Sequence, residues 1–221
     1  MELTPRLALA AEYCRGSRRV IDVGCDHAYL CIALVRQGVE LAWASDLRPG
    51  PLAAAREHIR QMGETERIRT VLCPGLEGFS TEDADTVVIC GMGGELMASI
   101  LQAAPWTGDG RHRLVLQPMT HGERLRRFLA ENGYTVEREG LAREGGRLYT
   151  LLQARGGEPP MGENNAYLFT DLLAQDPLFP AFLEKEREKW RRAAAGKRQA
   201  GLPTREEDAI LKRLEEWSHG A

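Results

Sequence analysis

The stretch Val20–Leu30, with the sequence VIDVGCDHAYL, decides the fold of this chain. Apolar β-branched residues lead into Asp22, Gly24 and Asp26, and a helical pattern follows at once. This order predicts a strand, a tight turn at a glycine and the start of a helix. A glycine lets the backbone approach a ligand closely because it has no Cβ. The turn is therefore a candidate ligand site at the carboxyl end of a strand.

The residues around this turn indicate which ligand it suits. A pyrophosphate prefers backbone N–H groups and a GxGxxG pattern, but the run from Gly24 to Tyr29 is GCDHAY, with a single glycine. Asp22, Asp26 and Asp46 instead supply three carboxylates. An acid-lined loop favours a ligand with an ammonium or sulfonium group and a free ribose. S-adenosylmethionine (AdoMet) has all three, so we expect it as the cofactor.

Length and composition bound the class of protein. The chain has 221 residues, which is long enough for one or two domains. Its net charge is −3, so any nucleic-acid binding would depend on a local basic face rather than on the overall charge. The five cysteines form no CxxC pair and no zinc-spaced cluster, so we expect reduced thiols, a cytoplasmic protein and no metal. We expect no signal peptide and no membrane span, because the N-terminus has no basic region before an apolar core and no apolar run is long enough.

Strand and helix patterns alternate along the first two thirds of the chain. Strands are expected at 19–23, 41–45, 68–73, 86–90 and 113–117, and a closing hairpin at 135–142 and 147–154. Helices are expected near 5–14, 27–37, 51–62, 94–104 and 121–132. Such alternation predicts an α/β fold, a Rossmann-like and mostly parallel sheet covered on both faces. The hairpin adds an antiparallel terminal strand at the edge, which is typical of class I methyltransferases rather than of dinucleotide dehydrogenases.

The composition changes after the hairpin. We predict a linker at 155–162, between an AdoMet-binding domain at 1–157 and a helical, coiled-coil-like domain at 163–221. Helices in the second domain are expected at about 168–176, 179–196 and 204–217, the last of them opened by a capping-box pattern. From Lys185 to Arg205 there are eight basic and two acidic residues, a local charge of +6. This run is either an RNA-binding face or a solvated helix surface.

Four loops are expected at the carboxyl edge of the sheet. Asp46 closes the second strand about 20 residues after the turn, where an acid binds ribose hydroxyls in Rossmann-type sites. Leu76 can pack on a flat base. A single glycine at a strand end is more often needed only for the geometry of its turn. Four loops at the same edge of the sheet, taken together, favour a binding site. The expected cofactor-binding residues are Asp22, Gly24, Cys25, His27, Asp46, Leu47, Gly75, Leu76, Gly91, Met92 and Gly93.

The loop after the fourth strand carries a negative signal. Methyltransferases that modify an exocyclic amine often have an Asn/Asp-Pro-Pro-Tyr/Phe loop here, whereas this chain has CGMGG at 90–94. The sequence therefore favours a ring nitrogen as the methyl acceptor. Asp26 is a candidate catalytic carboxylate, and its alternative role is a helix N-cap.

The chain resembles the bacterial tRNA (adenine-22-N1)-methyltransferases of the TrmK type. The motifs that carry the resemblance are LTPRL at 3–7, VGCDHAYL at 23–30, GMGG at 91–94, LVLQP at 114–118, LAENGY at 129–134 and GRLY at 146–149. The resemblance implies AdoMet as donor, tRNA as substrate and N1 of an adenine as acceptor, with Asp26 as the catalytic residue. The chain departs from the family pattern at Cys31, Pro74 and Met119.

The expected substrate residues come from the cavity edge and from the basic run. They are Tyr29, Gln117, Pro118, Lys189, Arg191, Arg192, Lys197 and Arg198. We expect tRNA as the partner, no membrane, and a monomer rather than an oligomer. A methyltransferase for another RNA, a protein or a small molecule is the alternative. A non-catalytic RNA-binding Rossmann protein is a more distant alternative. A dinucleotide oxidoreductase is the most distant alternative.

Overall fold

The computed structural model describes residues 2–158 and 169–219, with side chains described up to residue 217. The chain forms two compact units, Met1–Leu173 and Ala174–Ala221. The first unit extends beyond residue 157, because Thr170 donates two hydrogen bonds to the buried Glu139 carboxylate, from its backbone N–H at 2.9 Å and its hydroxyl at 2.8 Å. Residues 163–168, assigned to the helical domain by sequence, lie outside the described residues.

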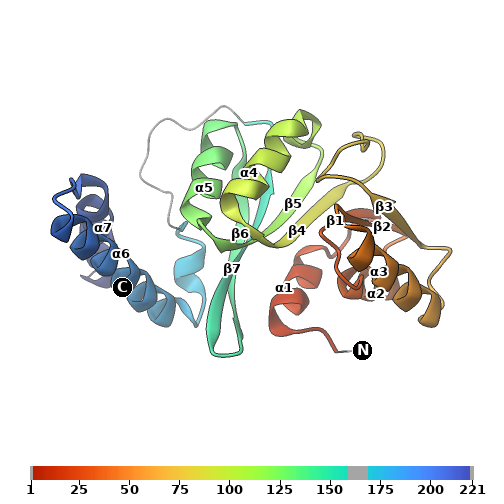
Figure 1. Cartoon of the computed structure of the whole chain (residues 1–221), viewed down its shortest axis with the longest axis horizontal. Coiled ribbons are helices and arrows are strands. Elements are labelled where there is room, and N and C mark those ends of the chain that lie inside the picture. Colours follow the sequence, from red (N-terminus) through yellow and green to blue (C-terminus); the bar gives the residue numbers. More distant parts are fainter. Residues whose placement is uncertain (1, 159–168, 220–221) are drawn as a thin grey trace. The chain divides into compact units, whose positions relative to one another are not determined.

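The first unit is built on one seven-stranded sheet with the order β3-β2-β1-β4-β5-β7-β6 (Figure 1). Its strands are β1 Arg19–Val23, β2 Leu41–Asp46, β3 Ile68–Leu72, β4 Thr86–Gly93, β5 Arg113–Thr120, β6 Thr135–Glu144 and β7 Arg147–Arg155. The first five pair in parallel, and β7 is antiparallel to both β5 and β6. The predicted mostly parallel sheet is confirmed. The antiparallel strand is not at the edge, however, since β7 fills the place between β5 and the outer strand β6.

Alternation along the strands divides the core into two layers. Val20 packs with residues of α1, α2 and α3 on one face, whereas Ile21 and Val23 pack with α4 and α5 on the other. The same switch separates Leu151 from Leu152 on β7. Figure 1 shows α4 and α5 lying side by side. The helices are α1 Pro5–Tyr13, α2 Tyr29–Arg36, α3 Pro49–Gln61, α4 Gly94–Ala103 and α5 Gly122–Glu131, with a 3-10 turn η1 at Pro105–Gly108.

Two boundaries differ from the sequence prediction near the carboxyl edge. Helix α2 begins at Tyr29 rather than at residue 27, because Asp26 and Ala28 have left-handed φ values of 47° and 57°. Strand β4 continues through Gly93 and pairs irregularly with β5, although the sequence predicted a loop from residue 91. Both differences fall on segments that contribute lining residues to the cavity described below.

The second unit contains an antiparallel helix pair, α6 Phe179–Gln199 and α7 Arg205–His219. The rings of Phe179 and Trp217 meet edge to face, with centroids 6.0 Å apart. The predicted helix at 168–176 is wrong over its described part, which holds only the 3-10 turn η2 Leu173–Gln175; Leu168 lies outside the described residues. The two later helices are present as predicted.

Candidate functional site

A cavity of about 1030 Å³ opens at the carboxyl edge of the sheet in the first unit. The loops after β1, β2 and β3 line it together with the ends of β4 and β5 and parts of α1, α2 and α4. Eleven of the residues predicted for the site lie on its wall: Asp22, Gly24, Cys25, Asp26, Tyr29, Asp46, Leu47, Gly75, Leu76, Gly91 and Met92. The predicted residues His27, Gly93, Gln117 and Pro118 do not line it.

The glycine turn is fixed to the neighbouring strand. The backbone N–H groups of Gly24 and Cys25 both donate to the Ser45 carbonyl, at 2.8 and 3.0 Å. Gly24 has a left-handed φ of 76°, and a Cβ at this position would collide with the Met92 side chain. The turn therefore requires glycine for its conformation, whereas the Met92 methyl group is the end of a flexible side chain and can move aside.

Carboxylates outnumber cations on the cavity wall. Four acidic residues line it, Asp22, Asp26, Asp46 and Glu77, against two arginines, Arg6 and Arg48. This excess predicts a cationic or neutral ligand, because a phosphate group would be repelled from the interior.

The two acids at the ends of β1 and β2 are buried but differ in their surroundings. Burial raises the pKa of the Asp22 carboxyl most, the thiol of Cys31, 3.5 Å away, lowers it, and the nearby Asp46 charge raises it; together they bring this pKa to about 7. Asp46 Oδ1 accepts a hydrogen bond from the Arg48 backbone N–H at 2.8 Å. The other Asp46 oxygen accepts no hydrogen bond from the residues that the structure describes. It is therefore available to ligand hydroxyl groups.

Asp26 is presented to the mouth of the cavity by an unusual backbone. Its side chain is 73% exposed, and the cap of α2 is the left-handed Ala28, with no side-chain hydrogen bond. Asp26 thus does not cap the helix, which removes the structural alternative considered for it. Left-handed conformations of non-glycine residues concentrate at functional sites because they carry strain.

His27 does not line the cavity that its neighbours line, although its Nε2 lies 3.8 Å from Asp26 Oδ1. Its carbonyl oxygen is 2.8 Å from Nδ1 of His58 on α3, and its ring lies 5.6 Å from that of Tyr29. Gly93, also outside the lining, instead approaches the Thr120 hydroxyl of β5. The structure therefore gives neither residue a direct place against a cofactor.

Gln117 lies behind the cavity wall rather than on it. The side chain is fully buried, and its Oε1 accepts from Arg6 Nη1 at 2.9 Å and from the Gly91 N–H at 3.1 Å. Its Nε2 donates to the Pro118 carbonyl at 2.9 Å. Gln117 consequently acts on the cavity by holding Arg6 and the end of β4 in place.

Sequence reasoning assigned no role to several lining residues. Arg6 was visible within LTPRL, but no spacing relates the start of α1 to the carboxyl edge of the sheet. Pro74 and Met119 were noted only as departures from the family pattern. The other lining residues that were missed come from α1, α2, α4 and strand ends: Leu7, Val23, Leu30, Arg48, Cys73, Glu77, Cys90, Leu96, Ser99, Ile100 and Ala103.

The five basic residues predicted to contact RNA all lie on α6 of the second unit, and each faces a carboxylate. On α6 itself the pairs are Lys189–Glu186 at 3.5 Å, Arg191–Glu184 at 3.8 Å and Arg192–Glu188 at 3.5 Å. Towards α7 the pairs are Lys197–Glu207, at 2.6 Å, and Arg198–Asp208. The Glu207 carboxylate is buried and that of Glu186 is partly buried, but the other three pairs are exposed. Exposed ion pairs are weak and can exchange a carboxylate for a phosphate.

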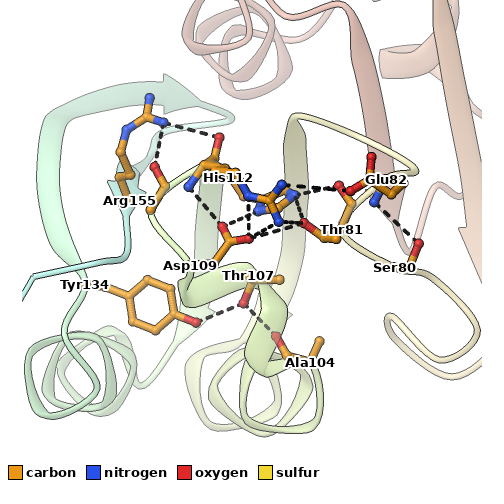
Figure 2. A network of polar contacts seen from close by, with 11 residues as sticks. Ser80, Thr81, Glu82, Ala104, Thr107, Asp109, His112, Tyr134 and Arg155 are labelled. Atoms are coloured by element: carbon orange, nitrogen blue, oxygen red, sulfur yellow. Dashed lines mark hydrogen bonds and ion pairs between the residues drawn. The ribbon is translucent and has the colours of Figure 1, made fainter.

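A second polar cluster lies in the first unit, outside the cavity lining (Figure 2). His112 Nδ1 is 2.8 Å from Asp109 Oδ1, and its Nε2 is 3.4 Å from the Thr81 hydroxyl. That order of groups is typical of nucleophile activation. The Thr81 hydroxyl, however, already donates to Asp109 and accepts from Arg111, at 3.2 and 2.7 Å. The cluster therefore ties the 80–83 loop to the start of β5 and serves stability.

Within residues 2–158 and 169–219, no cluster of three metal-ligating side chains occurs, and no helix is long and apolar enough to cross a membrane.

Comparisons with known proteins give the same architecture. The family described as "Methyltransferase domain" matches residues 3–152. The chain is 32% identical over 188 residues to the tRNA (adenine(22)-N(1))-methyltransferase of Bacillus subtilis, which covers 85% of this chain and 77% of that protein.

Solved structures align over nearly the whole chain. The crystal structure of the Bacillus subtilis tRNA methyltransferase TrmK superposes with a TM-score of 0.77 at 29% identity, covering 97% of this chain and 95% of that one. Sp1610 of Streptococcus pneumoniae, in complex with S-adenosyl-L-methionine, gives a TM-score of 0.82 at 29% identity, covering 98% and 99%.

Proposed function

Because the chain belongs to the family of tRNA (adenine-22-N1)-methyltransferases, we propose that it transfers a methyl group from AdoMet to N1 of an adenine in tRNA. The single observation that carries this proposal is the acid-lined cavity at the carboxyl ends of β1 to β4. Its four carboxylates suit a cofactor with a sulfonium, an ammonium and two ribose hydroxyl groups.

The lining residues fit the parts of AdoMet in order along the sheet. Asp46 would bind the ribose with its unpaired oxygen, and Leu76, on the loop after β3, would pack against the adenine ring. The Gly24 turn and Asp22 would face the methionine part. The strand order β3-β2-β1-β4 then leaves the β4 side of the cavity, with Gly91, for the methyl acceptor.

The chemistry asks little of the protein beyond position and charge. Bound AdoMet supplies an electrophilic methyl group on sulfur. Adenine N1 has an in-plane lone pair, so no base is needed before attack, and alignment of the two groups is the main contribution. As the N–C bond forms and the C–S bond breaks, positive charge moves to the adenine. The Asp26 carboxylate would stabilise that charge and could accept a proton from the exocyclic amine afterwards.

In folded tRNA the N1 edge of an adenine is often paired or stacked. The base must be turned out of the helix to reach the cavity, which costs roughly a few kcal/mol. The open mouth beside Asp26, with its 73% exposed side chain, provides the place where such a base would enter.

The test is to incubate the protein with AdoMet and unmodified tRNA, digest the RNA and identify the methylated nucleoside by mass spectrometry. We expect 1-methyladenosine at a single position. Methylation of small acceptors or proteins in place of tRNA would favour the alternative methyltransferase. Failure to bind AdoMet in calorimetry would favour the non-catalytic RNA-binding protein.

We further propose that the helix pair α6–α7 grips tRNA through its basic residues. A truncation after Leu173 should weaken tRNA binding more than AdoMet binding. A truncation at the start of the predicted linker, after Arg155, would remove Thr170. Ending at Leu173 instead retains the two hydrogen bonds from Thr170 to the buried Glu139 carboxylate. Equal tRNA affinity of the two proteins would contradict this role. We also propose that the protein is cytoplasmic, since tRNA is its substrate, and monomeric, which light scattering tests.

A further inference from the structure

Three aromatic rings gather beside Asp26, and we call His27, Tyr29 and His58 the aromatic cluster. The Tyr29 ring lies edge-on to that of His58, with centroids 4.8 Å apart, and 5.6 Å from that of His27. Tyr29 follows the glycine turn at the start of α2, whereas His58 comes from α3, so the cluster joins two helices.

The cluster holds the Tyr29 ring in one place. His58 Nδ1 lies at 2.8 Å from the His27 carbonyl oxygen, which ties α3 to the turn. The left-handed backbone at Asp26 and Ala28 sets the direction in which Tyr29 leaves the chain. Such a backbone is strained at both residues, so the presentation of this ring is built into the turn.

Tyr29 has two properties that no other lining residue combines. Among the residues that the structure describes, it is the one aromatic residue on the cavity wall, and it is 42% exposed. The described chain has seven exposed large hydrophobic residues, and four of them line this cavity: Tyr29, Leu47, Leu96 and Met119. Exposed apolar side chains gathered in this way mark a binding surface.

The surroundings select the kind of group that this surface receives. Asp26 precedes the cluster, and carboxylates dominate the cavity, so an anionic group is disfavoured. A flat, uncharged ring gains most from an exposed aromatic face. The CGMGG segment at the end of β4 contains no aromatic side chain, so Tyr29 is the residue placed to supply one.

We propose that the Tyr29 ring stacks on the acceptor adenine of tRNA after this base leaves its helix, and that His58 is a positioning residue for Tyr29. This inference rests on the proposed function and deepens it, because it names how the base is held. The stack presents the base edge to Asp26, three residues earlier in the chain, while the backbone phosphates stay outside the acid-lined cavity.

The experiment measures kcat/KM for tRNA and the Kd of AdoMet in matched variants. Tyr29→Leu keeps apolar bulk and removes the ring, so kcat/KM should fall roughly 5- to 150-fold, as expected for the loss of one base stack. Tyr29→Phe keeps the ring and should stay within about threefold of the wild type. The control is Leu72→Ala, since Leu72 is 55% exposed but does not line the cavity.

Two further readouts separate stacking from other roles. The salt dependence of kcat/KM should be the same in Tyr29→Leu and the wild type, because stacking neutralises no phosphate. His58→Leu should lower kcat/KM in the wild type and have little further effect in Tyr29→Leu, because it acts through the ring. Unfolding midpoints and AdoMet affinity should be unchanged.

The proposal is overturned if Tyr29→Leu methylates tRNA as well as Leu72→Ala does. It is also overturned if AdoMet affinity falls as far as kcat/KM, since Tyr29 would then belong to the cofactor site. A wild-type protein that methylates no tRNA would instead contradict the proposed function itself, and the stacking role with it.

Discussion

Replacing Asp46 with asparagine tests the cofactor end of the cavity. Asp46 is buried at the end of β2, and its Oδ1 accepts the Arg48 backbone N–H at 2.8 Å. Asparagine has nearly the same size, and its carbonyl oxygen can still accept from Arg48. The substitution therefore removes the negative charge while leaving the local turn intact.

The magnitude follows from the bonds that remain. A hydrogen bond to a charged group contributes about 1.5 to 3 kcal/mol, and a neutral one about 0.5 to 1.5 kcal/mol. The asparagine amide can still bond to a ribose hydroxyl, so the change loses charge assistance rather than the whole contact. A loss of roughly 1 to 3 kcal/mol over two hydroxyl groups weakens the Kd of AdoMet about 5- to 150-fold.

The same substitution has a second effect through Asp22. Burial and, to a smaller extent, the Asp46 charge raise the pKa of the Asp22 carboxyl to about 7. The ionised form attracts a cationic cofactor, so AdoMet affinity of the wild type should increase as the pH rises through about 7. Without the Asp46 charge the pKa of Asp22 falls, and the increase should move to lower pH.

The assay is calorimetric titration of AdoMet at pH values on either side of this pKa. Asp171→Asn is the control, because Asp171 is an exposed carboxylate in the same unit that does not line the cavity. Unfolding midpoints should match in all three proteins. A Kd for Asp46→Asn within about threefold of the control would refute the assignment of the ribose to Asp46.

Three further predictions concern the acceptor end and the fold. Asp26→Ala should keep the Kd of AdoMet within about tenfold of the wild type but strongly lower methyl transfer; unchanged turnover contradicts its role. Arg6→Gln should lower kcat/KM for tRNA and reduce its salt slope by about 0.7 to 0.9, since Arg6 would bind one phosphate at the cavity edge. The control is Arg138→Gln, which removes the hydrogen bond from Arg138 to Glu12 of α1 and should not change this slope. Equal slopes in both variants would refute the contact between Arg6 and a phosphate. For Asp109, burial opposes ionisation, but hydrogen bonds from the Arg111 backbone, the His112 ring and the Arg111 guanidinium outweigh it and lower the pKa of the carboxyl. This stabilisation is present above the unfolded pKa near about 4 and is lost as the pH falls below it, so the stability deficit of Asp109→Asn in urea unfolding should shrink in acid; a constant deficit contradicts the reasoning.

The succession of strands and helices along the chain could be predicted from the sequence because its signals are local. Alternating apolar residues such as Val20 and Ile21 fix the strands, and a glycine or an acid marks each strand end. The antiparallel ending followed from the hairpin, but the place of β7 inside the sheet depends on pairing between distant segments. Local patterns do not contain that information.

The candidate site divides in the same way. Asp22, Gly24 and Asp46 lie within or directly after their strands, so their positions follow from the strand ends. Arg6 and His58 reach the site from helices, and only the packing of those helices on the sheet brings them there. The left-handed backbone at Asp26 and Ala28 was missed because neither residue is a glycine.

The strand order also explains how one cavity can serve both a small cation and a polyanion. The chain builds outward from β1 to β3 on one side and from β4 to β5 on the other, so the loop after β1 and the junction of β4 with α4 diverge and leave a gap between them. Buried acids at this gap attract the cofactor but repel phosphates. A polynucleotide can therefore enter only by a single base, and its backbone must be held by cations outside the gap. That requirement accounts for an uncharged aromatic face at the mouth and for basic residues carried on a separate helical unit.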